Sequence, residues 1–321
     1  MSRWPVGVAL VAAATAAAAG SLPKNIVGRV TSACVLIQAI EGQRANSGSG
    51  FFVARNEVLT NYHVVKAAVD GDARIAVVVD SGTRDRQVVE ADLVGADEQL
   101  DLALLRTKHR SASTLRFLRE SQLRVTQDVW VAGYPFGTQP GLELTLTAGT
   151  ISSLRHNEGK GLRQVQIDAS INPGNSGGPV VDDKGRVAGV TRAVVSPKVG
   201  AGMAIAIPCG AAEEFVKQAR KFRRRTKSLR LMGRTSRRGL RILRAEKIEE
   251  PWGTTVQLSV RGARGAEDVE SFSIELADRR RDPLRTRDIT VENLQPREKK
   301  TIAVRLKGVD FDDIAACRIV D

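Results

Sequence analysis

Short apolar runs rich in Val, Ile, Leu and Ala recur from about Lys24 to Pro208, and Gly, Pro, Asn and Asp separate them. They come roughly ten residues apart, which is typical of strands in barrels and sandwiches. The runs read SACVLIQAI, SGFFVA, IAVVVD, LALLRT, DVWVAG, LELTLTAGTISS, RQVQID, PVVDDKGRVAGVT and MAIAIP. This region of about 185 residues predicts a mainly β protein with two small antiparallel barrels.

The segment CGAAEEFVKQARKFRRR, residues 209–225, has a different period. Phe215, Ala219 and Phe222 fall at i, i+4 and i+7, so they share one face of a helix. Acidic residues near its start and basic residues near its end suit the helix dipole. We therefore expect a helix whose Phe-bearing face packs against the second barrel.

Alternation of apolar and polar residues returns from about Gly239. TTVQLSV, SFSIELA and TIAVRLKG each place three apolar side chains on one face of a strand. With LRILRAEKIE ahead and IAACRIVD behind, these runs predict a small, Ig-like β-sandwich over 239–321. The basic, strand-poor segment 226–238 is then a linker between the sandwich and a first domain over 24–225.

The first twenty residues form a separate segment in which Arg3 is the only charge. An apolar stretch runs from Val6 to Ala19 and ends in small residues, as in a secretory signal peptide. The stretch is shorter than the ~20 residues of a membrane-spanning helix, although an uncleaved anchor remains the alternative. The segment predicts export to a bacterial periplasm or cell envelope, or secretion.

The chain has three cysteines, Cys34, Cys209 and Cys317. An odd count in an exported protein does not indicate a disulfide scaffold, and each cysteine lies in an apolar context. We expect buried free thiols, with a Cys34–Cys209 bridge left open. No Cys/His cluster has the spacing of a metal site, and no cofactor is implied.

The net charge of +13 has a local origin. Residues 217–247 hold fourteen Lys or Arg and one acid, Glu246, so that 14 − 1 = +13 and the rest of the chain sums to zero. The segment reads either as a solvated helix end and linker or as a surface that binds an anionic membrane or cell-wall polymer. Nucleic acid is the least favoured partner, because the segment has few aromatics and matches no nucleic-acid-binding fold.

The stretch INPGNSGGPV, residues 171–180, places Ser176 among glycines. A nucleophilic serine needs an exposed hydroxyl, a base, and backbone N–H groups aimed at the developing oxyanion. Glycine allows positive φ and close backbone approach, so the composition fits a nucleophile loop. The alternative is a Gly-rich hairpin with an incidental serine.

Two further segments supply the partners that such a serine needs. VLTNYHVV places His63 directly after an apolar strand, and EQLDLALL places Asp101 directly before another. The order His, Asp, Ser is that of the chymotrypsin-like arrangement. Asp97 is a rival carboxylate four residues earlier.

At these residues the chain resembles trypsin-like serine proteases, and more closely the HtrA/DegP-type bacterial enzymes. The resemblance implies that the two antiparallel barrels are six-stranded. The resemblance spans about residues 30–208 and is carried by GSGFFV…VLTNYHVV, DEQLDLALL, LTAGTISS…QVQIDASINPGNSGGPVVDDKGRVAGV and GAGMAIAIP. It implies that Ser176 attacks the scissile carbonyl, that His63 acts as base and then acid, and that Asp101 orients His63. It also implies an oxyanion hole from the amides of Gly174 and Ser176, with Asn175 shaping the turn.

The resemblance further implies a substrate pocket beside Ser176. Its floor would be Ser170, six residues before the nucleophile, and its wall would include Met203 and Ile205. An aspartate at the floor would select Arg or Lys, but Asp168 lies nearby and not at that position. We expect cleavage after small or medium aliphatic residues such as Val, Ala or Leu.

Two departures from the family limit what carries over. HtrA-type enzymes usually carry a PDZ domain after the protease, and this chain has no recognisable PDZ pattern, so assembly into a homo-oligomer is left open. VAGYPFG also has Tyr134 where many relatives have Asn.

The resulting hypothesis is an exported serine endopeptidase that acts on proteins or peptides in envelope quality control or processing. The alternative is a binding or chaperone-like envelope protein with a latent protease fold. A third reading is an envelope adaptor built on the basic segment and the sandwich.

Overall fold

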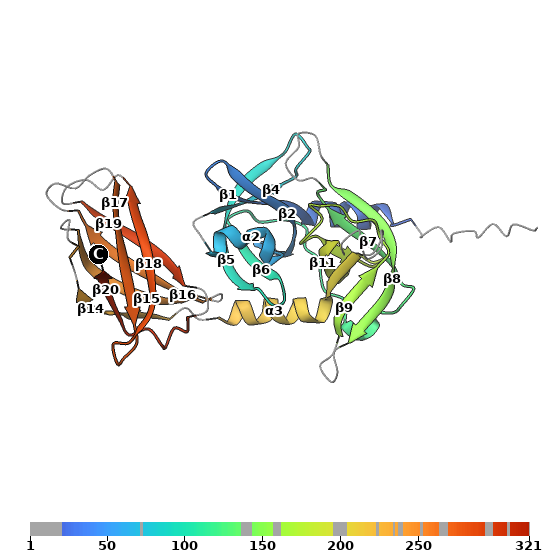
Figure 1. The fold of residues 1–321 in the computed structure, drawn as a ribbon. Coiled ribbons are helices and arrows are strands. Elements are labelled where there is room, and N and C mark those ends of the chain that lie inside the picture. The colour runs from blue at the N-terminus through green and yellow to red at the C-terminus, as the bar shows by residue number, and fades with distance from the viewer. Residues whose placement is uncertain are drawn as a thin grey trace, which may run out of the picture.

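The computed structural model describes residues 21–70, 73–135, 143–156, 162–194, 204–222, 225–233, 235–236, 240–250, 253–262, 269–292, 298–306 and 309–320. The signal peptide predicted for residues 1–20 and the pocket residue Met203 lie outside these ranges. Figure 1 shows three strand-rich bodies: two barrels side by side, and a sandwich beside the first barrel.

The first barrel is closed, with strand order β1-β2-β3-β6-β5-β4. Helix α1 precedes it, and helix α2 joins β3 to β4. The elements are α1 (Lys24–Ala33), β1 (Cys34–Glu41), β2 (Arg44–Ala54), β3 (Glu57–Thr60), α2 (Tyr62–Asp70), β4 (Arg74–Val79), β5 (Gln87–Asp97) and β6 (Leu102–Thr107).

The second barrel is also closed, with strand order β10-β11-β12-β9-β8-β7. A short 3-10 helix, η1 (Glu120–Gln122), lies in the connection between the barrels. The strands are β7 (Asp128–Gly133), β8 (Thr145–His156), β9 (Leu162–Ile167), β10 (Pro179–Val181), β11 (Val187–Val194) and β12 (Ala204–Pro208). The two predicted barrels are confirmed.

Strand β6 shows why the apolar runs are continuous and do not alternate. Leu102 and Leu104 face a core shared with the second barrel, whereas Ala103 and Leu105 face the interior of the first. Successive side chains of a strand point to opposite faces, so a strand that is buried on both faces is apolar at every position. The shared core therefore fixes one barrel against the other.

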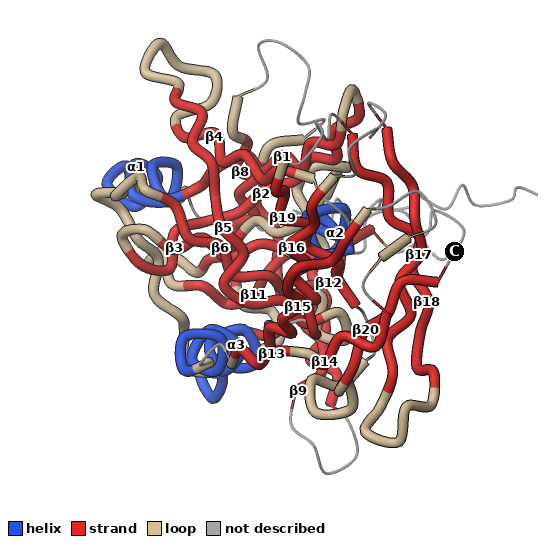
Figure 2. Tube along the Cα trace, turned by 90° about the vertical axis from the view of Figure 1, so that its left-hand side faces the viewer, coloured by secondary structure: helices blue, strands red, loops and turns tan. Residues whose placement is uncertain are grey.

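Helix α3 (Cys209–Lys221) follows the second barrel, as its period predicts. Its buried face includes Phe215, Val216 and Ala219, which belong to the core shared by the barrels. The helix contacts β11 and β12 of the second barrel but also β5 and β6 of the first, so it bridges both barrels and does not pack on the second alone. In Figure 2, α1 and α3 both lie at the left-hand margin of the molecule.

The C-terminal body consists of two four-stranded sheets, β13-β15-β16-β19 and β14-β20-β17-β18, packed on one apolar core, which confirms the predicted sandwich. Strand β19 also approaches helix α2 of the first barrel. The strands are β13 (Thr226–Ser228), β14 (Arg230–Gly233), β15 (Arg241–Glu250), β16 (Gly253–Arg261), β17 (Val269–Ala277), β18 (Pro283–Glu292), β19 (Lys299–Leu306) and β20 (Ala316–Val320).

The basic linker expected over 226–238 is wrong in its first half. β13 pairs with β15 in one sheet and β14 pairs in parallel with β20 in the other, so both belong to the sandwich. The chain crosses between the sheets at Leu229, which is buried in the sandwich core. Both strands lie at sheet edges, where one row of backbone groups stays unpaired and charged side chains are common, so no apolar alternation marked them.

None of the helices among the described residues is long and apolar enough to span a membrane.

Candidate active site

His63 lies in the first turn of α2, where that helix leaves β3. Its Nδ1 is 2.9 Å from Oδ2 and 3.0 Å from Oδ1 of Asp101, and its backbone amide donates to the same carboxylate at 3.0 Å. The carbonyl of His63 accepts a 3.0 Å hydrogen bond from Asn46 Nδ2. The ring is held through Nδ1, and the side chain is 44% exposed, so Nε2 is the nitrogen left for a substrate or a nucleophile.

Asp101 is buried directly before β6 and adopts a left-handed backbone conformation with φ +59°. Aspartate tolerates this region better than most residues, and Asn61 Nδ2 donates to the Asp101 carbonyl at 2.8 Å. The rival carboxylate of Asp97 instead accepts the Leu100 amide at 2.9 Å, which closes the turn that leads to Asp101. The structure thus brings Asp101, and not Asp97, to His63.

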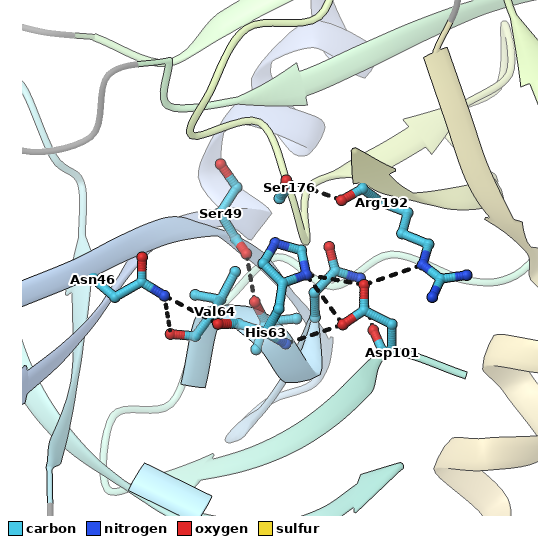
Figure 3. A network of polar contacts seen from close by, with 9 residues as sticks. Asn46, Ser49, His63, Val64, Asp101, Ser176 and Arg192 are labelled. Atoms are coloured by element: carbon cyan, nitrogen blue, oxygen red, sulfur yellow. Dashed lines mark hydrogen bonds and ion pairs between the residues drawn. The ribbon is translucent and has the colours of Figure 1, made fainter. Parts of the chain in front are cut away.

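Ser176 lies in the loop between β9 and β10. Its hydroxyl donates to the carbonyl of Arg192 on β11 at 3.0 Å. In Figure 3 the His63 ring lies between Ser176 above it and the Asp101 carboxylate below it. His63 and Asp101 of the first barrel are in direct contact, and Ser176 of the second barrel joins the same network through Arg192.

Two consecutive turns shape the loop around Ser176. Asn175 N donates to Asn172 O at 3.1 Å, and Gly178 N donates to Asn175 O at 3.0 Å. Gly174 has φ +102°, a conformation that glycine adopts without strain. Within the described part of the chain, neither the Gly174 amide nor the Ser176 amide has a hydrogen-bond acceptor. These two free N–H groups are what an oxyanion hole requires.

The glycines after Ser176 have a packing role. A Cβ on Gly177 would lie 2.2 Å from the Ser49 carbonyl, and a Cβ on Gly178 would lie 2.1 Å from the Ala132 carbonyl. Any larger residue would push the loop away from the barrel walls. The Gly-rich composition therefore allows the loop to seat closely against both barrels.

Three residues that sequence reasoning did not single out belong to this network. Ser49 on β2 bonds to the backbone of the Ser176 loop, Asn61 holds the Asp101 backbone, and Arg192 Nε lies 3.3 Å from Asp101 Oδ2. Arg192 thus contacts the carboxylate through its side chain and the serine through its carbonyl. The segments GSGFFV and TNYHVV contain two of them, but only the fold reveals their partners.

The predicted pocket residues are only partly described. Ser170 is exposed in the loop after β9, and Ile205 on β12 is half-buried and pairs with Gln166 and Ala193. The Asp168 carboxylate bonds to the amide and hydroxyl of Thr150. Asp168 is therefore held by β8, in keeping with its exclusion from the pocket floor.

The three cysteines are buried and free, and no disulfide joins them. Burial raises the pKa of the Cys209 thiol and of the Cys317 thiol to about 12, and raises that of Cys34 still further. Burial likewise raises the pKa of the Tyr134 phenol above its usual range. These thiols are structural in character and are not nucleophiles. Among the described residues, no group of three or more His, Cys, Asp or Glu side chains could hold a metal ion.

Comparison with known proteins bears on the same region. Residues 48–190 match the family model of the trypsin-like peptidase domain. The chain contains a trypsin-like peptidase domain. A Bartonella henselae protein named "Probable periplasmic serine endoprotease DegP-like" is 42% identical to it over 176 residues, which is 53% of this chain and 33% of that protein.

Solved structures of related proteins share the peptidase fold. A serine endoprotease from Yersinia pestis aligns with a TM-score of 0.52 and 27% identity over 65% of this chain and 70% of that chain. A protease from M. tuberculosis in its active form aligns with a TM-score of 0.52 and 25% identity over 62% of this chain and 85% of that chain. The matched part of the chain corresponds to about a third of the length of the DegP-like relatives.

Proposed function

We propose that the chain is a serine endopeptidase in which Ser176, His63 and Asp101 act together through an acyl-enzyme. The observation that carries the proposal is the contact of the Asp101 carboxylate with His63 Nδ1, which leaves Nε2 as the nitrogen for proton transfer. The loop of Ser176 adds two backbone amides without an acceptor. Serine attack on an amide carbonyl needs each of these parts.

The steps follow from the placement of the residues. The Ser176 hydroxyl leaves the Arg192 carbonyl and turns toward His63, which takes its proton as Oγ bonds to the scissile carbonyl carbon. The amides of Gly174 and Ser176 stabilise the oxyanion. His63 then gives the proton to the leaving amine, and a water molecule, activated by His63 in the same way, hydrolyses the acyl-enzyme. Asp101 stabilises the imidazolium formed in each half-reaction.

Labelling with a fluorophosphonate probe tests the proposal, because the probe reports an activated serine without knowledge of the substrate. Wild type is compared with Ser176→Ala, and casein degradation is followed in parallel. We expect labelling and degradation in the wild type and neither in the variant. Labelling that persists in Ser176→Ala would contradict the assignment of the nucleophile.

A second function is favoured by one observation, the hydrogen bond that holds the Ser176 hydroxyl on the Arg192 carbonyl and not on His63. In this form the chain would be a binding or chaperone-like envelope protein whose peptidase site is latent. A wild-type protein that binds unfolded casein but neither labels nor cleaves would support it.

The proposed specificity is cleavage after small or medium aliphatic residues. Ile205, half-buried on β12, supports an apolar pocket wall, and the exposed Ser170 supplies no negative charge. A peptide library dominated by products cleaved after Val, Ala or Leu would support this specificity, and one dominated by Arg or Lys would overturn it.

We also propose the cellular setting and the domain plan. The relatives are named periplasmic proteases, which supports an exported protein that acts on protein substrates in envelope quality control or processing. The pairing of β13 and β14 supports a peptidase domain that ends with α3 and a sandwich that begins near Arg225. An anionic membrane or cell wall stays a proposed partner of the basic segment.

A further inference from the structure

We propose that Ser49 is the positioning residue that sets the geometry of the loop carrying Ser176. The inference rests on the proposed peptidase function and adds a residue that does not itself touch the substrate. Ser49 lies on β2 of the first barrel, is fully buried, and contacts a loop of the second barrel that is 125 positions away in sequence.

Every polar atom of Ser49 makes a hydrogen bond. Figure 3 shows Ser49 in the same network as His63, Asp101 and Ser176. Its Oγ donates to the Gly174 carbonyl at 2.7 Å and accepts from the Tyr134 amide at 2.8 Å. Its backbone amide donates to the Ser176 carbonyl at 2.8 Å, and its carbonyl accepts from Thr60 Oγ1 at 2.7 Å. One residue therefore ties the nucleophile loop to β3 and to the segment after β7.

The two hydrogen bonds from Ser49 to the loop lie on either side of the peptide unit that contains the Ser176 amide. Each peptide unit is a rigid plane, so the bond to Gly174 O fixes the plane that also holds the Asn175 amide. The bond to Ser176 O fixes the plane that holds the Gly177 amide. Between them lies the plane with the Ser176 amide, one of the two proposed oxyanion donors. Ser49 thus limits the rotation of the donor.

The Gly174 amide depends on the same contact. Gly174 has positive φ and no side chain, so nothing in its own structure prevents the backbone from rotating. The Asn175 amide in the same peptide plane bonds to Asn172 O, and the Ser49 hydrogen bond to the Gly174 carbonyl adds a second restraint that comes from the first barrel. Loss of this bond would loosen both proposed donors, because the two turns within the loop would then act without the Ser49 hydroxyl. Preorganised donors are what lower the barrier to acyl transfer.

Only a hydroxyl serves here, because the same atom must donate to a carbonyl and accept from an amide. Alanine would leave both the Gly174 carbonyl and the Tyr134 amide without a partner. The surroundings are tight: a Cβ on Gly133 would lie 3.0 Å from Ser49 Oγ, which leaves little room for a substituting water.

The test compares Ser49→Ala with Ser111→Ala in the full chain. Ser111 is also a buried serine of the first barrel region, and its Oγ donates to the Ser113 carbonyl at 2.8 Å, away from the site. The rate of fluorophosphonate labelling is measured against probe concentration, which separates the maximal rate from the affinity for the probe. We expect Ser49→Ala to lower the maximal rate about ten- to a hundredfold with affinity unchanged within about twofold.

The matched variant Ser111→Ala shows whether loss of any buried serine hydroxyl is enough to slow labelling. Ser111→Ala should label at the wild-type rate even if both variants lose similar thermal stability. The proposal is overturned if Ser49→Ala labels at the wild-type rate. It is also overturned if Ser111→Ala slows labelling to the same extent.

Amide hydrogen exchange separates this inference from the proposed function. Ser49→Ala should speed exchange of the amides in residues 171–178, and Ser111→Ala should not. If the wild type fails to label, the peptidase proposal falls, but exchange still decides the role of Ser49. Unchanged exchange in 171–178 would overturn that role whatever the labelling result.

Discussion

Asp101 combines a backbone requirement with a chemical one. Its left-handed φ of +59° suits Asp or Asn, and Asn61 holds its carbonyl, while its carboxylate faces His63. The same position therefore accepts an isosteric amide without strain. This allows the charge to be removed while the local fold is kept.

We predict that Asp101→Asn folds normally but labels and cleaves about 10⁴-fold more slowly, because an amide no longer stabilises the correct tautomer and charge of His63. Steady-state cleavage of casein measures the loss of activity, and circular dichroism checks that the variant is folded. Asp97→Asn is the matched control, since the amide oxygen can still accept the Leu100 amide. Equal activity losses in the two variants would reject the assignment of Asp101.

The buried thiols give a pH prediction. Burial raises the pKa of Cys209 and Cys317 to about 12, whereas a thiol in the unfolded chain titrates near about 8.5. The folded protein holds these protons more strongly, so their contribution to stability is complete below about pH 8.5 and is lost as pH rises toward 12. We expect the urea concentration at the midpoint of unfolding to decrease as the pH is raised from 7.5 to 9.5. We also expect a thiol reagent at pH 8 to label the three cysteines only after the protein has unfolded. Rapid labelling of the native protein would contradict this.

Residue-level prediction depends on chemistry that leaves a local pattern in the sequence. His63, Asp101 and Ser176 each stand in a recognisable segment, and the structure brings the first two into contact at 2.9 Å. Ser49 and Arg192 left no such signal, because their partners are distant in sequence and several of those partners are backbone atoms. Every residue has a backbone carbonyl, so a side chain that donates a hydrogen bond to one cannot be identified from the spacing of residue types.

At the scale of elements, Glu57 at the start of β3 anchors α3 to the first barrel. Its buried carboxylate accepts Arg220 Nε of α3 at 2.7 Å and Arg106 Nη2 of β6 at 3.0 Å. Hydrogen bonds between charged groups contribute about 1.5–3 kcal/mol when buried, but both arginines are partly exposed, so water screens them.

We therefore expect Glu57→Gln to lower the free energy of unfolding by about 1–3 kcal/mol, measured by urea denaturation. Glu213→Gln removes an exposed carboxylate that pairs with Lys217 within one helix turn, and should cost no more than about 0.5 kcal/mol. If the two variants unfold at the same urea concentration, Glu57 does not anchor the helix.

Elements with a regular apolar pattern were predictable, and three edge strands that lack one were not. DVWVAG and LALLRT coincide with β7 and β6, since both strands are apolar along their length. The sequence did not single out β13, β14 or β18, the last of which alternates Arg285 and Arg287 with other polar residues at a sheet edge. Helices α1 and α2 were also missed, since each is short and lies among strand-like apolar runs.

At the scale of the whole molecule, the basic residues behind the net charge of +13 do not all lie on a solvated tail, because several belong to folded elements. Within 217–247, Arg220 pairs with Glu57, Arg225 pairs with Glu249 and Asp312, and Lys247 is buried with its ammonium on two backbone carbonyls. Part of the excess positive charge is thus paired with acids or buried within the fold, which weakens any attraction to an anionic surface. Arg230 and Arg241 stay exposed and pair with no acid among the described residues.

The remaining exposed bases lead to a last prediction about the proposed anionic partner. Each basic residue near an anionic surface contributes about 1 kcal/mol, so the double variant Arg230→Gln/Arg241→Gln should bind phosphatidylglycerol vesicles about tenfold more weakly or worse in a sedimentation assay at low salt. Arg84→Gln/Arg86→Gln removes the same charge from an exposed turn of the first barrel and should bind like the wild type. Binding should also disappear near 0.5 M salt, where screening is strong over about 4–5 Å. Equal weakening of binding by both pairs of substitutions would mean that net charge alone attracts the protein. Equal binding to neutral phosphatidylcholine vesicles would mean that the basic segment does not bind an anionic surface.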